Sequence, residues 1–340
     1  MAEIRFYFLV LSAIGFDLLV GDPSFFLHPV EIMGFYIKKI TDFFINYSKG
    51  NYNLLLLGGF LVAISTITLS FYAGKYFEIL FYQSEGNLIF GLIIFFGLSS
   101  CLAFKSLISI VKDISYSIKK NYTNKDSTRV ILDKVQKIVS RNVSKSSIED
   151  LLRSSTESLT ENAVDGIFAP LFWIFLGTFL MKFSIYLPGP LSLGLSYKAI
   201  STLDSMIGYK YNSYKYIGFF SAKIEDYATF IPCRLVAITL PIVSKEVRNY
   251  FYIIKKVFHE GNKYESPNSG ISEASFAYLT NIKLGGINEY PEGLVKKPII
   301  NSDGENITSH SINKICGLIL RLQILWVLIF SLTIYLINKF

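Results

Sequence analysis

SRNVSKSSIEDLLRSSTESLTENAVDGIFAP, residues 140–170, joins a polar segment directly to an apolar one. Its apolar side chains recur at helical spacing, which predicts an amphipathic helix. Glu157, Glu161 and Asp165 are four residues apart, so they lie along one face of that helix. Like charges in such a row repel by roughly 0.2–0.5 kcal/mol per pair, so they lie either in bulk water or beside a cation. Because the row ends at an apolar stretch, and because Mg²⁺ prefers carboxylate oxygens, we favour a magnesium site.

The composition places the chain among membrane proteins. Of its 340 residues, 51% are hydrophobic and 17% are charged, and the mean hydropathy is +0.41. These values are typical of the membrane class. The net charge of +7 comes from basic residues spread along the chain, so we expect no nucleic-acid partner. The three cysteines are far apart and form no CxxC pair, which argues against a disulfide framework and a zinc site.

Four apolar stretches are long enough to cross a membrane, at residues 4–20, 53–72, 88–111 and 316–337. Two shorter runs that contain proline, 167–181 and 231–243, are expected to be re-entrant or membrane-docked helices. Basic residues flank the large segment between the third and fourth spans, so the positive-inside rule places that segment in the cytoplasm and both termini outside. A six-span alternative keeps this charge bias but moves residues 197–230 outside.

We therefore predict an all-α, polytopic helical membrane protein of the cell membrane. Residues 1–111 form an N-terminal membrane region with three spans, and residues 316–340 form a C-terminal transmembrane helix. Residues 112–315 between them form a large cytoplasmic helical domain, which is partly docked on the membrane and carries the chemistry.

Two polar motifs border the predicted membrane region. His28 follows Gly21-Asp22-Pro23 and precedes a proline. It belongs either to a tight membrane-exit turn or to an imidazole site held on rigid backbone at the membrane surface. Asp204 lies in a short polar cluster that Tyr209 and further tyrosines follow. This cluster is either a capped helix start with an interfacial aromatic belt or a flat ligand platform.

Arg234 lies inside an apolar run, where an unpaired guanidinium is costly. It either pairs with the acids at 225–226 or binds a phosphate group, since its planar fork suits both. Asn268 lies in one Gly/Asn-containing loop, and Gly285 and Gly286 lie in a second. Glycine lets backbone amides approach an anion closely, although most such loops are only turns.

Taken together and in this order, these pieces resemble the CobD/CbiB family, the adenosylcobinamide-phosphate synthases of cobalamin biosynthesis. The resemblance spans nearly the whole chain except its hydrophobic tail. It rests on GDPSFFLHPVEIMG (21–34), ESLTENAVDGIFAPLFW (157–173), KAISTLDSMIGYK (198–210), YIGFFSAKIEDYATFIPCRL (216–235) and SPNSGISEASFAYLTNIKLGGINEY (266–290). The chain departs from the family at Asn142, where the usual residue after the arginine is aspartate.

The resemblance implies a helical integral membrane ligase. Such an enzyme joins an amino-alcohol phosphate, usually aminopropanol phosphate, to a propionate carboxylate of adenosylcobyric acid and so makes an amide. It implies ATP as a substrate and Mg²⁺ as a cofactor. It also implies a corrinoid and an amino-alcohol phosphate as small-molecule partners, and we expect association with other cobalamin-pathway enzymes.

For this reaction we expect Glu157, Glu161 and Asp165 to bind the metal and ATP. The amine must lose a proton before it attacks, so Asp204, Glu161 and His28 are the candidate catalytic residues. The candidates for binding phosphate or the corrin edge are Arg141, Arg234, Asn162, Asn268, Gly285, Gly286 and Tyr209.

Two other functions compete with catalysis. A transporter or corrinoid-binding membrane protein is the main alternative, because acids beside membrane spans also occur in transport pathways. Against it, the predicted spans carry few ionisable groups, and the sequence shows no repeat with a midplane site. A purely structural subunit of a biosynthetic assembly would need none of the motif carboxylates for catalysis.

Overall fold

A computed structural model describes residues 2–21, 28–121, 125–144, 146–209, 214–290 and 293–339. These residues are predominantly helical, and the contacts between them divide the chain into two compact units. Unit 1 comprises Met1–Lys105 and Asp165–Thr229, and unit 2 comprises Ser106–Val164 and Phe230–Phe340. The predicted helical membrane class is confirmed, and one β-hairpin accompanies the helices. The predicted division at residues 111 and 315 stays a prediction.

Five helical stretches are long and apolar enough to cross a membrane: Tyr52–Gln83, Leu88–Lys120, Ile148–Met181, Phe219–Val243 and Ser309–Ile337. Three of them contain predicted spans. The other two contain the short apolar runs at 167–181 and 231–243, each of which continues a preceding helical segment. The length of these two helical stretches therefore does not argue against a membrane crossing at either run. The predicted first span at 4–20 is helical but is not among the five found in the described residues.

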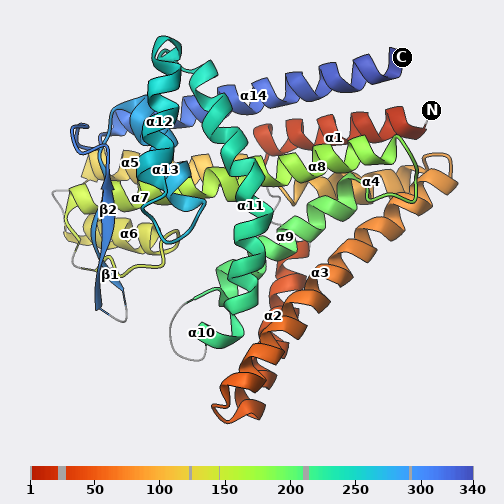
Figure 1. Cartoon of the computed structure of the whole chain (residues 1–340), viewed down its shortest axis with the longest axis horizontal. Helices are drawn as coiled ribbons and strands as arrows, with labels where there is room; N and C mark the ends of the chain where they lie inside the picture. The colour runs from red at the N-terminus through yellow and green to blue at the C-terminus, as the bar shows by residue number, and fades with distance from the viewer. Residues whose placement is uncertain are drawn as a thin grey trace. The chain divides into compact units, whose positions relative to one another are not determined.

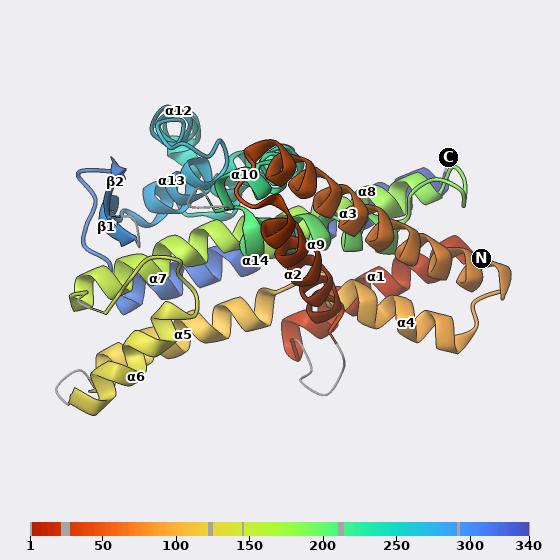
Figure 2. The same ribbon diagram turned by 90° about the horizontal axis from the view of Figure 1, so that it is seen from below.

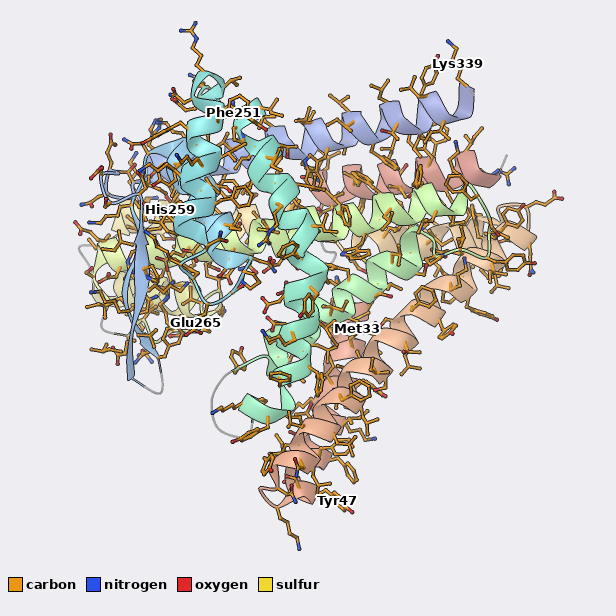
Figure 3. All side chains as sticks on the ribbon, in the orientation of Figure 1. Met33, Tyr47, Phe251, His259, Glu265 and Lys339 are labelled. Carbon is orange, nitrogen blue, oxygen red and sulfur yellow. The ribbon has the colours of Figure 1, made fainter. Side chains whose placement is uncertain are left out.

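Unit 1 is a layer of packed helices built around α9. Its helices are α1 (Ala2–Leu19), α2 (Pro29–Ser48), α3 (Tyr52–Gln83), α4 (Leu88–Ser99), α8 (Ala169–Met181), α9 (Pro190–Ile207), α10 (Tyr214–Ile217) and the first half of α11 (Phe219–Thr239). α9 packs against α2, α3 and α8, and α3 and α9 lie side by side in both ribbon views (Figures 1 and 2). Met33 of α2 is buried, whereas Tyr47, near the opposite end of the same helix, is exposed (Figure 3).

A glycine and a buried carboxylate allow α9 to approach α3 closely. A Cβ atom on Gly74 would lie 2.6 Å from Cα of Ser192, so a larger residue would force the helices apart. Glu78 is fully buried and accepts hydrogen bonds from the backbone N–H groups of Leu191 at 2.7 Å and Ser192 at 2.9 Å. These N–H groups belong to the first turn of α9 and have no partner within that helix.

The same region of α3 holds the connection between α8 and α9. Lys75 donates hydrogen bonds to the backbone carbonyls of Ile185 and Leu187. Gly86, in the turn after α3, lies so close to Arg5 of α1 that a Cβ atom there would clash with the guanidinium. The start of α1, the end of α3 and the α8–α9 connection therefore lie at one end of unit 1.

Unit 2 contains the remaining elements. They are α5 (Phe104–Asn121), α6 (Lys125–Gln136), α7 (Ile148–Ala163), the second half of α11, η2 (Leu240–Val243), η3 (Val247–Asn249), α12 (Tyr250–Gly261), α13 (Ser269–Thr280), β1 (Leu284–Tyr290), β2 (Gly293–Ile300) and α14 (Ser309–Lys339). A π-helical turn, η1 (Val164–Phe168), joins α7 to α8. α13 packs against α7, α12 and both strands. Phe251 is exposed at the opposite end of α12 from His259 (Figure 3).

The hairpin of β1 and β2 was not predicted. Its strands are antiparallel, with Gly286 opposite Lys297 and a register shift between Leu284 and Gly286. Gly285 and Gly286 have φ angles of +86° and +108°, which side chains with a Cβ rarely adopt. Two adjacent glycines lower the strand propensity of this segment, which is why the sequence indicated only a loop.

Candidate functional site

The buried charged residues of unit 2 converge where α7 contacts α13 and the hairpin. Glu157 of α7 is 1% exposed, and its Oε1 accepts a hydrogen bond from the backbone N–H of Gly285 at 2.9 Å. Its Oε2 accepts one from Arg141, which is also buried. Arg153, one turn earlier on α7, lies 3.5 Å from Oε1. The carboxylate is therefore neutralised by two arginines and a backbone N–H group.

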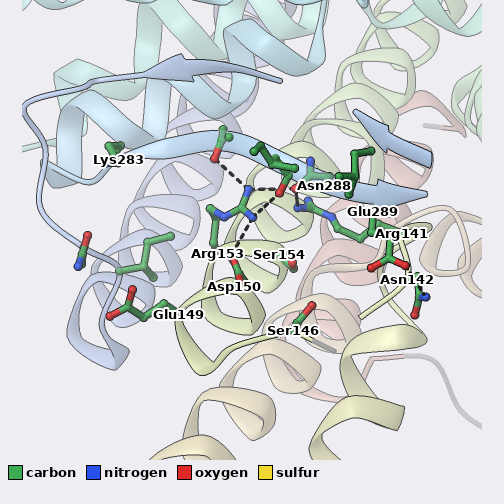
Figure 4. Close-up of a pocket in the computed structure, with 16 residues that line it drawn as sticks. Arg141, Asn142, Ser146, Glu149, Asp150, Arg153, Ser154, Lys283, Asn288 and Glu289 are labelled. Carbon is green, nitrogen blue, oxygen red and sulfur yellow. Dashed lines mark hydrogen bonds and ion pairs between the residues drawn. The ribbon is translucent and has the colours of Figure 1, made fainter. Parts of the chain in front are cut away.

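Arg153 connects α7 to strand β1. Its Nη1 donates to the carbonyl of Gly285 at 2.9 Å and to Oδ1 of Asn288 at 3.0 Å. Its Nη2 donates to the carbonyl of Ile287 at 3.0 Å and to Asp150 at 2.9 Å. Figure 4 shows these contacts as dashed lines. Sequence analysis missed Arg153, although its spacing of four residues before Glu157 is an available signal.

The side-chain oxygen of Asn288 accepts hydrogen bonds from both arginines, and its side-chain nitrogen is left without an acceptor among the described residues. Its Oδ1 accepts from Arg141 as well as from Arg153, which fixes the orientation of the amide. Its Nδ2 is buried and has no hydrogen-bond partner among the described residues. A buried donor left in this state costs about 1–3 kcal/mol. This group is therefore a candidate contact for a ligand.

A pocket of about 520 Å³ opens beside this network, and we call it the hairpin pocket (Figure 4). Both signs of charge line it. The basic residues are Arg141, Arg153 and Lys283, and the acidic residues are Glu149, Asp150 and Glu289. Burial by itself would lower the pKa of Arg141, but the carboxylate of Glu157 beside it raises that pKa above its ordinary value.

A second buried carboxyl, Glu273 of α13, lies near the first. It accepts hydrogen bonds from the hydroxyl of Tyr264 at 3.1 Å and from Nζ of Lys297 at 3.2 Å. Burial raises the pKa of Glu273 to about 8; Lys297 opposes the shift, and the negative charges of Glu157 and Glu161 add to it. Sequence analysis did not single out Glu273 or Lys297. The signal was a lone acid among small and apolar residues in the last family motif.

Glu157 and Glu161 both lie near Lys297, and the magnesium site stays a prediction. Among the residues that the structure describes, no three His, Cys, Asp or Glu side chains form a group that could hold a metal ion. Both oxygens of Glu157 already accept hydrogen bonds, from Arg141 and from the N–H of Gly285. Glu161 is half-buried in unit 2, whereas Asp165 belongs to unit 1.

Asp165 and Asp204 lie in a separate group of acids within unit 1. Tyr197 of α9 is fully buried, and its hydroxyl lies 2.9 Å from that of Thr229. Burial raises the pKa of Tyr197, and the nearby charges of Asp165, Glu225 and Asp204 raise it further. Asp165 and Asp204 therefore both act on Tyr197 within unit 1.

His28 caps helix α2. Its Nδ1 accepts a hydrogen bond from the N–H of Val30 at 3.3 Å. It also lines an apolar pocket of about 480 Å³ in unit 1. Residues 22–27 of the same motif lie outside the described residues.

Tyr209 and Asn162 make local hydrogen bonds. The hydroxyl of Tyr209 donates to the carbonyl of Ser205 at 2.8 Å, and the amide of Asn162 donates to the carbonyl of Ser158 at 2.8 Å. Residues 210–213, which include part of the predicted tyrosine platform, lie outside the described residues.

Arg234 fixes the loop that leads into α13. Its guanidinium donates to Oδ1 of Asn268 at 2.6 Å and to the carbonyl of Pro267 at 2.8 Å, and it stacks on the ring of Phe230 at 3.6 Å. The contacts of Arg234 in unit 2 are thus with loop acceptors, and its role in binding phosphate stays a prediction. This arrangement also occupies the side-chain oxygen of Asn268.

Comparison with known proteins places these motifs in one family. The family described as "CobD/Cbib protein" matches residues 10–319. A "Cobalamin biosynthesis protein CobD" from Clostridium acetobutylicum is 34% identical over 97% of this chain and 99% of its own length. Proteins of the same name from Synechocystis and Clostridium tetani are 35% and 31% identical, over 94% and 96% of this chain and 89% and 96% of their own lengths. No solved structure matches this chain. The names of these relatives describe biosynthesis rather than transport.

Proposed function

The chain belongs to the CobD/CbiB family of cobalamin biosynthesis, and from this premise we propose that it is an ATP-dependent amide synthase. It would join an amino-alcohol phosphate to a propionate carboxylate of adenosylcobyric acid and release adenosylcobinamide phosphate. The observation that carries this proposal is the buried network of Arg141, Glu157 and Asn288, in which residues from separate parts of the family pattern meet.

The reaction needs activation of the acid and deprotonation of the amine. A carboxylate is a poor acylating agent, so its oxygen first takes the γ-phosphoryl group of ATP, and ADP leaves. The free amine then attacks the acyl carbon, an amide bond forms and inorganic phosphate departs. A proton leaves the ammonium before the attack, so a carboxylate near the amine assists as general base.

Glu161 is the best candidate for that base within unit 2. It is half-buried, and no hydrogen bond or ion pair of its carboxylate lies within the described part of the chain. Lys297 is close enough for the charge of Glu161 to act on it. Burial alone would lower the pKa of Lys297, but Glu273, Glu161 and Glu157 raise it, so the ammonium stays charged and offsets negative charge at the site.

Magnesium and ATP belong to the proposal through the family. Glu161 is the remaining candidate ligand in unit 2, and Asp165 is the candidate in unit 1. When bound, Mg²⁺ would neutralise charge on the phosphates of ATP. The part of the segment 112–315 that belongs to unit 2 would face the cytoplasm, which supplies ATP, and other enzymes of the pathway would supply the corrinoid.

One experiment tests the reaction directly. The full chain, purified in detergent, is incubated with cobyric acid, ATP, Mg²⁺ and aminopropanol phosphate, and the product is identified by mass spectrometry. We expect the mass of the amide, and a loss of about a hundredfold or more in rate for Glu161→Gln, because general bases contribute about that much. Asp165→Asn tests the second carboxylate, and exposed Glu246→Gln is the control. Absence of the product with the wild-type chain would sink the function, and full activity in Glu161→Gln would remove only the role of that residue.

A further inference from the structure

The charges around the hairpin pocket cancel. Arg141 is paired with Glu157, and Arg153 is paired with Asp150 at 2.9 Å. The remaining cation, Lys283, makes no ion pair with the described residues and shares the lining with the acids Glu149 and Glu289. Sites for phosphate groups present an excess of cationic donors. A balanced lining of this kind therefore disfavours the two phosphate-bearing substrates of the proposed reaction.

The uncharged polar side chains that line the pocket are amides and hydroxyls. Asn142, Asn288 and Asn306 supply three amide side chains, and Ser146 and Ser154 supply hydroxyls. An amide both donates and accepts hydrogen bonds, so it is complementary to another carboxamide. The buried Nδ2 of Asn288, which has no partner among the described residues, would be satisfied by a carboxamide oxygen.

Exposed apolar side chains complete the lining. Ile287 is 61% exposed on β1 and Leu294 is 74% exposed on β2, although both line the same pocket. A corrinoid combines carboxamide arms with a methylated ring, so this mixture of amides and apolar surface matches its two kinds of group. The volume of about 520 Å³ lies in the range of about 300–1,000 Å³ typical of ligand sites, so only one edge of a corrinoid would enter.

We propose that the hairpin pocket binds the carboxamide-bearing edge of the corrinoid substrate and not a phosphate group of ATP or of the amino alcohol. This inference rests on the proposed function for the identity of the ligand, and on the described residues of unit 2 for its place. It assigns the hairpin a role in recognition, with Asn288 and Asn306 as specificity-determining residues and Leu294 as an apolar contact.

The test measures binding without turnover. The full chain in detergent is titrated with dicyanocobyric acid, a coloured corrinoid, in the absence of ATP and amine, and the Kd is read from quenching of protein fluorescence. Asn306→Trp fills the pocket, and we expect it to raise the Kd at least about tenfold, the loss of roughly two hydrogen bonds. Asn262→Trp places the same ring on an exposed residue outside the pocket, and we expect its Kd to stay within about twofold of the wild type.

A charge substitution separates the corrinoid from phosphate ligands. Lys283→Gln should leave the Kd for dicyanocobyric acid within about twofold, because the carboxamide edge that enters the pocket carries no charge. The proposal is overturned if Asn306→Trp leaves that Kd unchanged, or if Lys283→Gln and Asn306→Trp weaken the binding of ATP or aminopropanol phosphate instead. If Asn306→Trp does not fold, Leu294→Ser, at an exposed strand position, carries the same test with an expected rise of about threefold.

Failure of this inference and failure of the proposed function give different results. If Asn306→Trp abolishes corrinoid binding and the wild-type chain makes no amide product, the proposed corrinoid site is supported and the proposed reaction is rejected. Amide formation by Asn306→Trp with an unchanged KM for cobyric acid would retain the reaction and reject the pocket.

Discussion

At the scale of single residues, the site depends most on the ion pair between Arg141 and Glu157. Both side chains are buried, so removing one leaves the other charged and unpaired, which costs about 3–5 kcal/mol. We expect Arg141→Met to lower the free energy of unfolding by about that amount, measured by denaturant unfolding in detergent. Lys134→Met is the control, because it breaks the exposed ion pair with Asp113 and should cost less than about 1 kcal/mol. Equal losses in the two variants would contradict the buried pair.

Glu273 should make stability depend on pH. Its pKa is 4.5 as a free side chain and about 8 in the folded protein, so the folded state binds this proton more tightly. Stability from this group is therefore present at low pH and is lost as the pH rises between these values. Lys297, Tyr264, Glu157 and Glu161 surround the carboxyl and shape this window.

The comparison with Glu273→Gln isolates that contribution, because glutamine does not titrate. We expect the unfolding free energy of the wild type, minus that of the variant, to fall from pH 5 to pH 8. Glu246→Gln, at an exposed position, should show no such trend. A difference that stays constant over the same range would show that Glu273 is ionised throughout.

The sequence identified single residues of the site more readily than the residues that they contact. The helical spacing of Glu157 and Glu161 was visible, and so was the arginine at 141. Glu157 is bound by Arg141, 16 residues earlier, and by the N–H of Gly285, 128 residues further along in β1, and periodicity does not contain that information. Lys297 and Glu273 were not identified as site residues for the same reason, because only the fold brings the two side chains into contact.

At the scale of elements, close helix packing depends on glycines that periodicity treats as equivalent. Gly74 lies against Ser192 of α9, whereas a Cβ atom on Gly15 of α1 would meet nothing within 4 Å. We expect Gly74→Ala to lower the thermal unfolding midpoint, because overpacking costs about 1–3 kcal/mol. Gly15→Ala should leave it unchanged or raise it, since alanine favours helix by up to about 1 kcal/mol. The same shift in both would show that α3 and α9 are not in close contact.

The hairpin shows where element prediction failed. A strand needs its partner, and the antiparallel register of β1 with β2 places Gly285 where its N–H reaches Glu157. The glycines that lower the strand propensity of β1 are also the residues that allow its backbone to approach Glu157. The helices over 53–72, 88–111 and 316–337, in contrast, were predicted because their apolar segments carry their own signal.

At the scale of the whole molecule, the helical membrane class was predicted from hydropathy and is confirmed. The docking of residues 167–181 without a membrane crossing stays a prediction. A run of that length looked too short to cross, yet it lies in the helical stretch Ile148–Met181. Its far end is tied to Lys75 of α3, which the charge bias places outside.

Cysteine labelling decides which side of the membrane this connection faces. The start of α1, the turn after α3 and the α8–α9 connection lie at one end of unit 1, so they should share one face of the membrane. We expect Tyr186→Cys, at a position 83% exposed, to react with a membrane-impermeant maleimide in intact cells, as Glu85→Cys does. Lys255→Cys, on α12, should react only after permeabilisation, because positive flanks hold that segment inside. The three native cysteines are buried and give little background. Labelling of Tyr186→Cys only after permeabilisation would instead indicate that residues 167–181 form a docked helix that does not cross the membrane.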